Sequence, residues 1–467
     1  MTARTLPASG ARPAAAAIAF DIMAASQATA AEISARQAER LTQLLWAARR
    51  TPLYRRALQG LDLARVVLNT LPVSSKPQWM GRFADAVADP QITLAGVRDF
   101  CAQPRSIGMP YLGRYAVWES SGSSGEPGLF VQDDTAMAVY DALEATRRSS
   151  PRPWLRCLDP LFLCERFAFV GAIGGHFASH VSVQRWRARH PWLTPNWRSF
   201  SILQPAADLV AQLNAFGPSI VATYPTAAVL LAEQAKRGTL HIRPQELWTG
   251  GETLSAAMRA CIEQNLGCAL RNSYGASEFL PIAWECDHQR LHLNADWVIL
   301  EAVDARHRPV PPGQLSQTTL LTNLANHVQP LIRFDIGDRI AFDTLPCPCG
   351  SALPTLQVQG RQDDVLHACG RDGTRVTLLP LALSTVLEEE AGLFDFQLRQ
   401  HSAQDWCLTL GPGAPHSRAV RERCRSVLAD FARRQGAVGL RIVTRVALAL
   451  PRGRSGKRRR IVAVDGD

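Results

Sequence analysis

The sequence contains no apolar run long enough to cross a bilayer, for which about 20 residues are needed. Its 11 cysteines are scattered and odd in number, which argues against the paired framework of a disulfide-rich secreted domain. An alanine-rich stretch over residues 13–31 follows two arginines, but Asp21 interrupts it. We interpret this stretch as a frayed N-terminus rather than a targeting segment, and we predict a cytoplasmic protein without membrane contact.

The sequence also lacks internal repeats and any recognised nucleic-acid-binding signature, although its formal net charge is +10. Much of this charge lies in the tail, at Arg452, Arg454, Lys457, Arg458, Arg459 and Arg460. Arginines are nevertheless spread along the whole chain, and such an excess suits an anionic small molecule or an acidic protein partner. We therefore expect no nucleic-acid partner, and we interpret residues 458–460 as a solvated basic tail.

Length and patterning predict an α/β protein with more than one structural unit, because 467 residues exceed a single compact core. Helical sequence prevails up to about residue 115 and includes an amphipathic helix over residues 31–50; another helix is expected over residues 135–148. Short apolar runs then alternate with helical stretches at 227–236 and 255–266. The runs lie at residues 161–164, 167–170, 219–223, 246–249 and 269–273. This alternation predicts a mainly parallel sheet covered by helices.

The later part of the chain changes character twice. Residues 297–342 are expected to form antiparallel strands. Beyond them a strand at 406–410, a helix at 417–434 and a strand at 440–446 indicate a small α+β unit. We predict a large domain over residues 1–362 and a small, mobile C-terminal lid domain over residues 363–467.

A loop without large side chains follows Glu119. It consists of Ser120, Ser121, Gly122, Ser123, Ser124 and Gly125. Such a loop offers backbone N–H groups and hydroxyls as donors, and glycine allows the close approach that a phosphate cradle needs. The loop lacks the Gly-Lys-Ser/Thr ending of a Walker A motif, and a flexible linker is the alternative interpretation.

Polar, glycine-bearing turns follow several of the predicted strands, at residues 174–176, 224–226, 250–252 and 274–278. Because ligands bind beyond the carboxyl ends of parallel strands, these turns are expected to converge on one binding site. From their positions we expect the substrate pocket to include Phe169, His176, Tyr224 and Phe279.

Cysteine and histidine residues cluster at two places, at residues 286–292 and 347–349. Thiolates with an imidazole suit zinc, and four protein ligands are typical of a structural site. We predict the ligands Cys286, His292, Cys347 and Cys349, with His288 as the alternative to His292. A pair of reduced cysteines in a turn is the competing interpretation.

Taken in order, these motifs resemble the adenylate-forming superfamily of acyl-CoA synthetases, peptide-synthetase adenylation domains and luciferases. The likeness is strongest to its phenylacetate–CoA ligase and coenzyme F390 synthetase branch, and it spans nearly the whole chain. It is carried by residues 51–54, 71–76, 120–127, 274–278, 333–338, 360–364 and 450–457.

The resemblance implies that ATP activates a carboxylic acid, aryl or similar, as an acyl-adenylate with release of pyrophosphate. A thiol, either coenzyme A or the phosphopantetheine of a carrier protein, then displaces AMP. The Ser/Gly loop would hold phosphates, Glu278 would hold Mg²⁺, and Ser277 would donate to a phosphate. The remaining ATP- or AMP-binding residues implied are Gly251, Glu252, Tyr274 (adenine), Gly275, Ala276, Asp338 (ribose) and Arg361 (ribose or phosphate).

Two further residues are implied by the resemblance. Lys457 would be the adenylation lysine, a point charge between the carboxylate and the α-phosphate. Asp363 would be the hinge at which the small domain rotates, exchanging Lys457 for the loop around Gly370 between the two half-reactions. One departure is Glu126, which stands where the family loop usually has a lysine.

Two other functions remain open. A degenerate member of the family would bind nucleotide or acyl-adenylate without turnover, and Glu126 is its support. A basic, zinc-containing nucleic-acid-binding protein would rest on the tail alone. The sequence does not reveal the acid, the acceptor or the oligomeric state.

Overall fold

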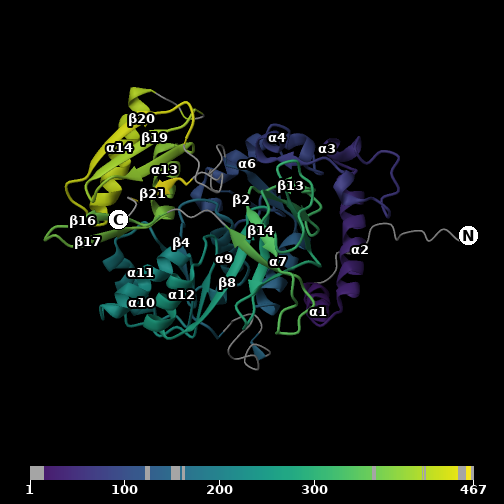
Figure 1. Cartoon of the computed structure of the whole chain (residues 1–467), viewed down its shortest axis with the longest axis horizontal. Coiled ribbons are helices and arrows are strands. Elements are labelled where there is room, and N and C mark those ends of the chain that lie inside the picture. Colours follow the sequence, from purple (N-terminus) through teal and green to yellow (C-terminus); the bar gives the residue numbers. More distant parts are fainter. Residues whose placement is uncertain are drawn as a thin grey trace, which may run out of the picture.

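The computed structural model describes residues 15–120, 127–148, 158–159, 164–359, 364–412, 414, 417–450 and 459–463 (Figure 1). Its N-terminal part contains α1 (Ala15–Ser26), α2 (Ala30–Ala48), α3 (Pro52–Arg55), α4 (Lys76–Met80), α5 (Phe83–Ala86) and α6 (Leu94–Cys101). A hairpin of β2 (Ala116–Glu119) and β3 (Leu129–Gln132) then leads into α7 (Asp134–Thr146). None of the described helices combines the length and the hydropathy that a bilayer span requires.

The expectation of a frayed N-terminus is wrong for the described residues of that stretch. Residues from Ala15 onward form α1, whose Ile18, Ile22 and Ala25 share one face and are buried against α7 and the main core. Asp21, which seemed to interrupt the apolar run, pairs with Arg36 and Arg40 of α2. The alanines therefore form a packed helix, because tertiary contacts and these ion pairs add to their high helix propensity.

A nine-stranded mixed sheet forms the centre of the molecule. Its strand order is β14 (Arg339–Phe342), β15 (Thr355–Gln359), β10 (Leu291–Leu293), β9 (Phe279–Glu285), β8 (Ala269–Ala276), β7 (Glu246–Thr249), β6 (Ile220–Thr223), β4 (Phe167–Gly171) and β5 (Trp197–Ser201). Strands β5 to β8 are parallel, and β9, β10, β15 and β14 continue the sheet in antiparallel pairs. The α/β prediction is confirmed, and so are the strands expected at 167–170, 219–223, 246–249 and 269–273.

Helices cover both faces of the parallel half of this sheet. Ala168 and Val170 of β4 face a core shared with α10 (Ala206–Phe216), α11 (Pro225–Lys236) and α12 (Ala256–Leu266). Phe167 and Phe169, one residue out of step, point to the opposite face, where α7 and α9 (Ala178–Arg189) lie. This period of two is the alternation of a strand that is buried on both sides.

A smaller sheet lies beside the large one, in the order β1 (Ser74–Ser75), β13 (Phe334–Asp335), β12 (Thr318–Asn323) and β11 (Val298–Val303). As expected, the strands within residues 297–342 have antiparallel neighbours, and only the pair of β1 and β13 is parallel. Arg333, at the start of one of the family motifs, is buried here. It donates to the Glu301 carboxylate and to the carbonyl oxygens of Asn69 and Leu71. Arg333 therefore joins the N-terminal helices to this sheet.

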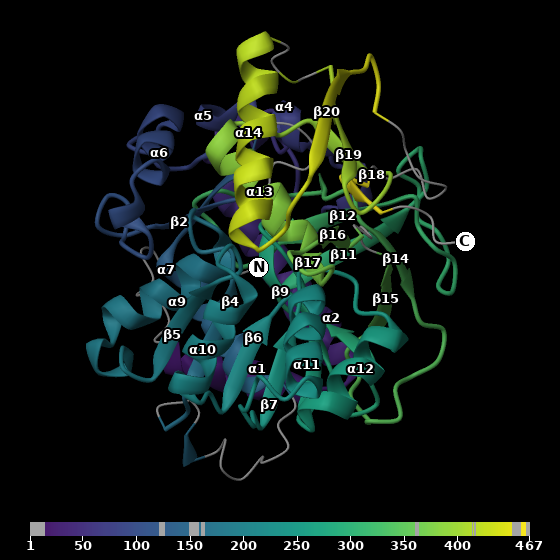
Figure 2. The ribbon, with the colours of Figure 1, turned by 90° about the vertical axis from the view of Figure 1, so that its left-hand side faces the viewer.

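The C-terminal residues form a unit with its own sheet, shown beside α10, α11 and α12 in Figures 1 and 2. It comprises β16 (Leu366–Cys369), β17 (Arg375–Leu378), α13 (Pro380–Ala391), β18 (Phe396–Gln400), β19 (Asp405–Leu410), α14 (Arg418–Arg434), β20 (Arg441–Val446) and β21 (Ile461–Val462). Gln435 Nε2 docks the unit by donating to the carbonyl oxygens of Leu203 (2.8 Å) and Gln204 (2.9 Å). The domain boundary predicted at residue 363 lies outside the described residues and stays a prediction.

Candidate active site and metal cluster

A cavity of about 800 Å³ opens at the carboxyl ends of the parallel strands. Its lining contains parts of the turns that follow β6, β7 and β8, as well as Asp338 after β13 and Lys76 at the start of α4. Helices α7 and α9 form one wall, and α13 of the C-terminal unit contributes Leu381, Thr385 and Glu388. Three of the four predicted turns thus converge on one cavity, whereas the lining does not include residues 174–176 of the fourth.

Tyr274 and Asp338 are tied to each other inside this cavity. The Tyr274 hydroxyl donates to Asp338 Oδ2 over 2.9 Å. Burial, together with the neighbouring Asp338 carboxylate, raises the pKa of Tyr274 well above its usual value. Tyr274 therefore remains a protonated donor, and the bond fixes its ring beside the Asp338 carboxylate.

The turn from Ser277 to Glu278 is anchored through its backbone from two directions. Trp118 Nε1 donates to the carbonyl oxygen of Ser277 (2.8 Å), and Asn323 Nδ2 donates to that of Glu278 (2.9 Å). Ser277 and Glu278 both line the cavity, and Glu278 is 8% exposed. The turn consequently presents a hydroxyl and a carboxylate to the cavity from a fixed backbone.

Two glycines of the site have no room for a side chain. A Cβ at Gly275 would lie 2.0 Å from the Leu280 carbonyl oxygen. Gly251 has φ +79°, and a Cβ there would lie 3.2 Å from the ring of Tyr224. A larger residue at either position would displace the turn that carries the cavity lining.

Glu252 binds protein atoms in the structure. Its carboxylate accepts from Thr226 N (3.0 Å) and from Thr226 Oγ1 (3.1 Å), at the start of α11. It thereby joins the turn after β7 to the turn after β6. This arrangement positions Gly250 and Gly251, which line the cavity.

Ser120 begins the Ser/Gly loop, and its contacts close the base of that loop. Ser120 Oγ accepts from Gly128 N (2.8 Å), and Ser120 N donates to Gly128 O (2.8 Å). Lys76 Nζ lies 3.4 Å from Ser120 Oγ. Lys76 belongs to one of the family motifs, but its place beside the loop base was not foreseen, because the two residues are 44 positions apart.

The four residues expected in the substrate pocket divide into two pairs. Phe169 and Tyr224 line the cavity, whereas the lining does not include His176 or Phe279. In each case the following residue, Phe177 or Leu280, lines it instead.

Phe279 and His176, which do not line the cavity, make structural contacts instead. Phe279 is fully buried and packs edge-on against Tyr140, with ring centroids 4.9 Å apart. Because side chains alternate along β9, Leu280 then faces the cavity. His176 Nε2 lies 3.0 Å from Ser106 Oγ, and burial lowers the pKa of His176, so this ring is neutral near pH 7.

Several expected site residues lie outside the described residues. They are Ser121, Gly122, Ser123, Ser124, Gly125, Arg361, Asp363 and Lys457, as well as Glu126. Their roles stay predictions.

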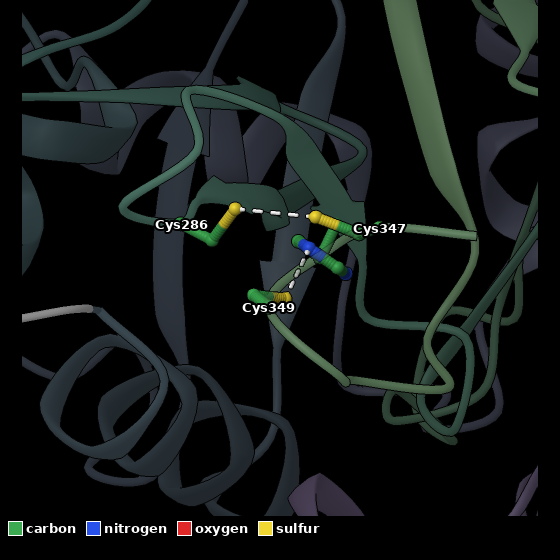
Figure 3. A group of neighbouring side chains, drawn as sticks. Cys286, Cys347 and Cys349 are labelled. Carbon is green, nitrogen blue, oxygen red and sulfur yellow. Dashed lines mark hydrogen bonds between the residues drawn. The ribbon is translucent and has the colours of Figure 1, made fainter. Parts of the chain in front are cut away.

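Four metal-ligand atoms gather at the far edge of the large sheet. The donor atoms of Cys286, His292, Cys347 and Cys349 all lie within 4.8 Å of one another. Figure 3 shows the three cysteines turned toward one another, with Cys286 Sγ 3.6 Å from Cys347 Sγ. Two thiolates bound to one tetrahedral zinc ion at about 2.3 Å would lie about 3.8 Å apart. The donor set and its spacing therefore fit zinc.

The structure favours His292 over His288 in this cluster. His292 lies on β10, where it is buried, and its Nε2 is 3.3 Å from Cys349 Sγ. Its Nδ1 lies 3.0 Å from the Leu353 carbonyl oxygen, the kind of outer contact that orients a metal-bound imidazole. His288 is exposed and outside the group.

The carboxylates of Glu119, Glu388 and Glu389 lie close together where α13 of the C-terminal unit borders the cavity. A Cβ at Gly175 would lie 3.1 Å from both Glu119 Oε1 and Glu389 Oε1. Glu388, the neighbour of Glu389 on α13, accepts from Arg460 Nη1 (2.5 Å). Arg460 is 5% exposed, so the interpretation of residues 458–460 as a solvated tail is wrong for this residue. Partial burial, then the charges of Glu119, Glu388 and Glu390, raise the pKa of Glu389 to about 7.

The raised pKa of Glu389 makes this arrangement sensitive to pH. A carboxyl whose pKa is higher folded than unfolded destabilises the fold as pH rises from about 4.5 to about 7. Glu389→Gln should therefore raise the apparent Tm at pH 8 and leave it nearly unchanged at pH 5. Glu389 is only partly buried and keeps contact with solvent, so screening should limit the gain to about 1 kcal/mol or less.

Differential scanning fluorimetry across this pH range measures the effect. Glu390→Gln is the matched control, because Glu390 Oε1 accepts from Arg434 Nη2 and its loss should bring no gain at pH 8. An equal gain for Glu389→Gln at both pH values would contradict the prediction.

No protein-family model matches the chain. A phenylacetate-coenzyme A ligase of Thermus thermophilus is 27% identical over 277 residues, which is 53% of this chain and 60% of that protein. The protein CapK of Staphylococcus aureus is 25% identical over 164 residues, which is 34% of this chain and 35% of that protein. The matches thus span 60% and 35% of the lengths of these curated relatives.

Solved structures match over almost the whole chain. A 2-hydroxyisobutyryl-CoA ligase in complex with 2-HIB-AMP and CoA aligns with a TM-score of 0.57 at 19% identity, covering 98% of this chain and 94% of that one. The same ligase in a postadenylation state with 2-HIB-AMP aligns with a TM-score of 0.53 at 19% identity, with the same coverage. The chain thus shares its fold with a 2-hydroxyisobutyryl-CoA ligase and part of its sequence with a phenylacetate-coenzyme A ligase.

Proposed function

We propose that the protein uses ATP to activate a carboxylic acid and then transfers the acyl group to a thiol. The observation that carries this proposal is the convergence of Gly251, Ser277, Glu278 and Asp338 on one cavity, beside Ser120 at the base of the Ser/Gly loop. The phenylacetate-coenzyme A ligase and the 2-hydroxyisobutyryl-CoA ligase to which the chain is similar have names that fit such a reaction.

The first half-reaction joins the acid to AMP. A carboxylate oxygen attacks the α-phosphorus of ATP, the bond from that phosphorus to the bridging oxygen breaks, and pyrophosphate leaves. The protein contributes position and charge rather than covalent chemistry. Tyr274 and Asp338 hold the nucleoside end, and the Ser/Gly loop holds the phosphates. Mg²⁺ would be held by Glu278 and would neutralise phosphate charge.

The second half-reaction moves the acyl group. The thiol sulfur attacks the carbonyl carbon of the acyl-adenylate, its proton is lost, and AMP leaves. Leu381, Thr385 and Glu388 of α13 line the cavity, so the C-terminal unit contributes to the surface that the thiol must approach.

Carboxylate-dependent exchange of pyrophosphate into ATP tests this function. Incorporation of labelled pyrophosphate that requires an added acid would support it. A protein that binds ATP but supports no exchange with any of a broad panel of acids would be a degenerate member, and the proposal would fail.

Lys76 is proposed to supply positive charge at the phosphate end of the site, where the Ser/Gly loop carries Glu126 in place of a lysine. Lys76→Ala should raise the KM for ATP about 10- to 100-fold, since hydrogen bonds to charged groups contribute about 1.5–3 kcal/mol. Exchange kinetics at varied ATP measure this.

Lys236→Ala is the matched control for Lys76→Ala. The chain has three lysines, Lys76, Lys236 and Lys457, and Lys236 is exposed at the end of α11, away from the cavity lining. An ATP KM unchanged in Lys76→Ala would contradict the assignment.

For the acceptor we propose the phosphopantetheine of an acidic carrier protein, with coenzyme A as the rival. Helix α14 carries Arg418, Arg421, Arg423, Arg425, Arg433 and Arg434. Arg425, Arg433 and Arg434 pair with Glu422, Asp430 and Glu390, but the helix keeps an excess of positive charge. This excess would steer an acidic carrier to the C-terminal unit and raise its association rate. Acyl transfer to a loaded carrier should fall with rising salt, and efficient transfer to coenzyme A without preference for the carrier would overturn this.

A further inference from the structure

The cavity continues beyond the nucleotide turns, down the face of the sheet that carries Phe167 and Phe169. On this face the strand register places Phe167 beside Trp197 of β5, and Phe169 beside Ala222 of β6. The next strand adds Trp248, whose ring centroid lies 5.6 Å from that of Phe167. All five residues line the cavity, so its inner part has a flat aromatic wall.

Helices α7 and α9 enclose this inner part, which we call the acyl chamber. The lining takes Ala178, Ser179, Ser182, Val183 and Trp186 from α9. From α7 and the residues that follow it come Tyr140, Asp141, Glu144, Ala145 and Arg148. The residues of α9 and of α7 follow the helical period, so each helix presents one stripe to the chamber, and Arg148 follows two residues after the end of α7.

The α9 stripe measures the depth of the chamber. From Ala178 to Trp186 it spans eight residue steps, or about 12 Å at the rise of an α-helix. The strands give the same result, because Phe167 lies four residues before the end of β4, or about 13 Å. Tyr140, whose hydroxyl accepts from Asn323 Nδ2, lies near the Glu278 turn, and Arg148 lies at the opposite end. A single-ring acid held at the turns would leave the lower half of this chamber unfilled.

The lower end holds a buried guanidinium with spare donors. Arg148 has a side chain that is 9% exposed, and its Cζ lies 4.3 Å from the centroid of the Trp248 ring. Its Nη2 pairs with Glu144, whereas Nε and Nη1 have no hydrogen-bond partner among the described residues. Buried donors without partners cost free energy, so this end of the chamber favours a ligand with an acceptor oxygen.

We propose that the acid is an extended aromatic acid, longer than one ring, with a hydroxyl or carbonyl oxygen at the end remote from its carboxylate, and that Arg148 binds this oxygen. The proposal rests on the proposed function for the direction in which the acid lies. The Arg148–Glu144 pair is neutral overall, which favours a neutral oxygen over a second carboxylate. A hydroxyl could accept from Arg148 and donate to Glu144.

The test compares benzoate, biphenyl-4-carboxylate and 4′-hydroxybiphenyl-4-carboxylate in pyrophosphate exchange. The hydroxylated two-ring acid should exceed each of the others in kcat/KM by about tenfold or more, the scale of one hydrogen bond to a charged group. Arg148→Met, which keeps the length of the side chain over Trp248, should remove the preference for the hydroxyl and leave use of biphenyl-4-carboxylate unchanged. Ala145→Phe should abolish use of both two-ring acids and spare benzoate.

Direct binding separates this inference from the proposed function. Trp186, Trp197 and Trp248 line the chamber, so quenching of tryptophan fluorescence reports an acid entering it without ATP. Absence of exchange with every acid would overturn the proposed function, while the fluorescence titration with Arg148→Met and Ala145→Phe would still decide the inference. Preference for benzoate, or two-ring binding that neither substitution weakens, would overturn it.

Discussion

Replacement of Lys457 by alanine is expected to abolish acyl-adenylate formation while leaving thiolysis of a supplied acyl-adenylate largely intact. Negative charge accumulates between the attacking carboxylate and the α-phosphate during the first half-reaction, and a lysine bridging the two would stabilise it. Loss of one such preorganised contact typically costs about 100- to 1000-fold in rate. Thiolysis involves no attack on phosphorus, so it should not depend on this charge.

The two half-reactions can be measured separately. Pyrophosphate exchange reports the first, and release of AMP from a synthetic acyl-adenylate in the presence of the thiol reports the second. Arg458→Ala is the matched control, because it removes the adjacent positive charge at a residue to which we assign no role in either half-reaction. An equal loss of both half-reactions in Lys457→Ala would contradict the assignment of Lys457 as the adenylation lysine.

Replacement of Cys347 by serine is expected to remove bound zinc and to lower thermal stability. We propose that purified protein carries about one zinc ion per chain, held by Cys286, His292, Cys347 and Cys349. The binding free energy of a structural metal contributes directly to folding. The ligands come from the end of β9, from β10 and from the segment before β15, so the ion would fasten three parts of the sheet edge.

Elemental analysis and thermal unfolding measure this effect. We expect the apparent Tm of Cys347→Ser to fall by roughly 5 °C or more. Cys164→Ser, at an exposed cysteine outside the group, should change neither quantity. His292→Gln should behave as Cys347→Ser does, and His288→Gln as the control does. A metal-free protein of normal stability would refute the site.

The polar turns at 224–226, 250–252 and 274–278 could be placed at one site from the sequence because parallel strands bring their carboxyl ends to a common edge. The metal ligands could be proposed from the sequence because cysteine and histidine residues at close spacing are typical of zinc sites. The choice between His288 and His292 needed the register of β10, which sets His292 opposite Trp284 and Thr355. The sequence shows which side chains can bind a metal, whereas the pairing of neighbouring strands decides which way each side chain points.

The errors have the same origin. His176 and Phe279 were each one residue away from a side chain that lines the cavity, since only the groups packed around a turn decide which face it presents. The alanine-rich start became a helix through its contacts with α7 and α2.

The other features of the site depend on contacts between segments that are distant in the sequence. Lys76 reaches Ser120 although 44 residues separate them, and α13 closes a cavity built from the other unit. The sequence by itself determined the motifs, their order and the reaction class that they suggest. The tertiary structure decided the depth of the acyl chamber and the place of Arg148 at its lower end, because a cavity is a property of how helices and sheet meet.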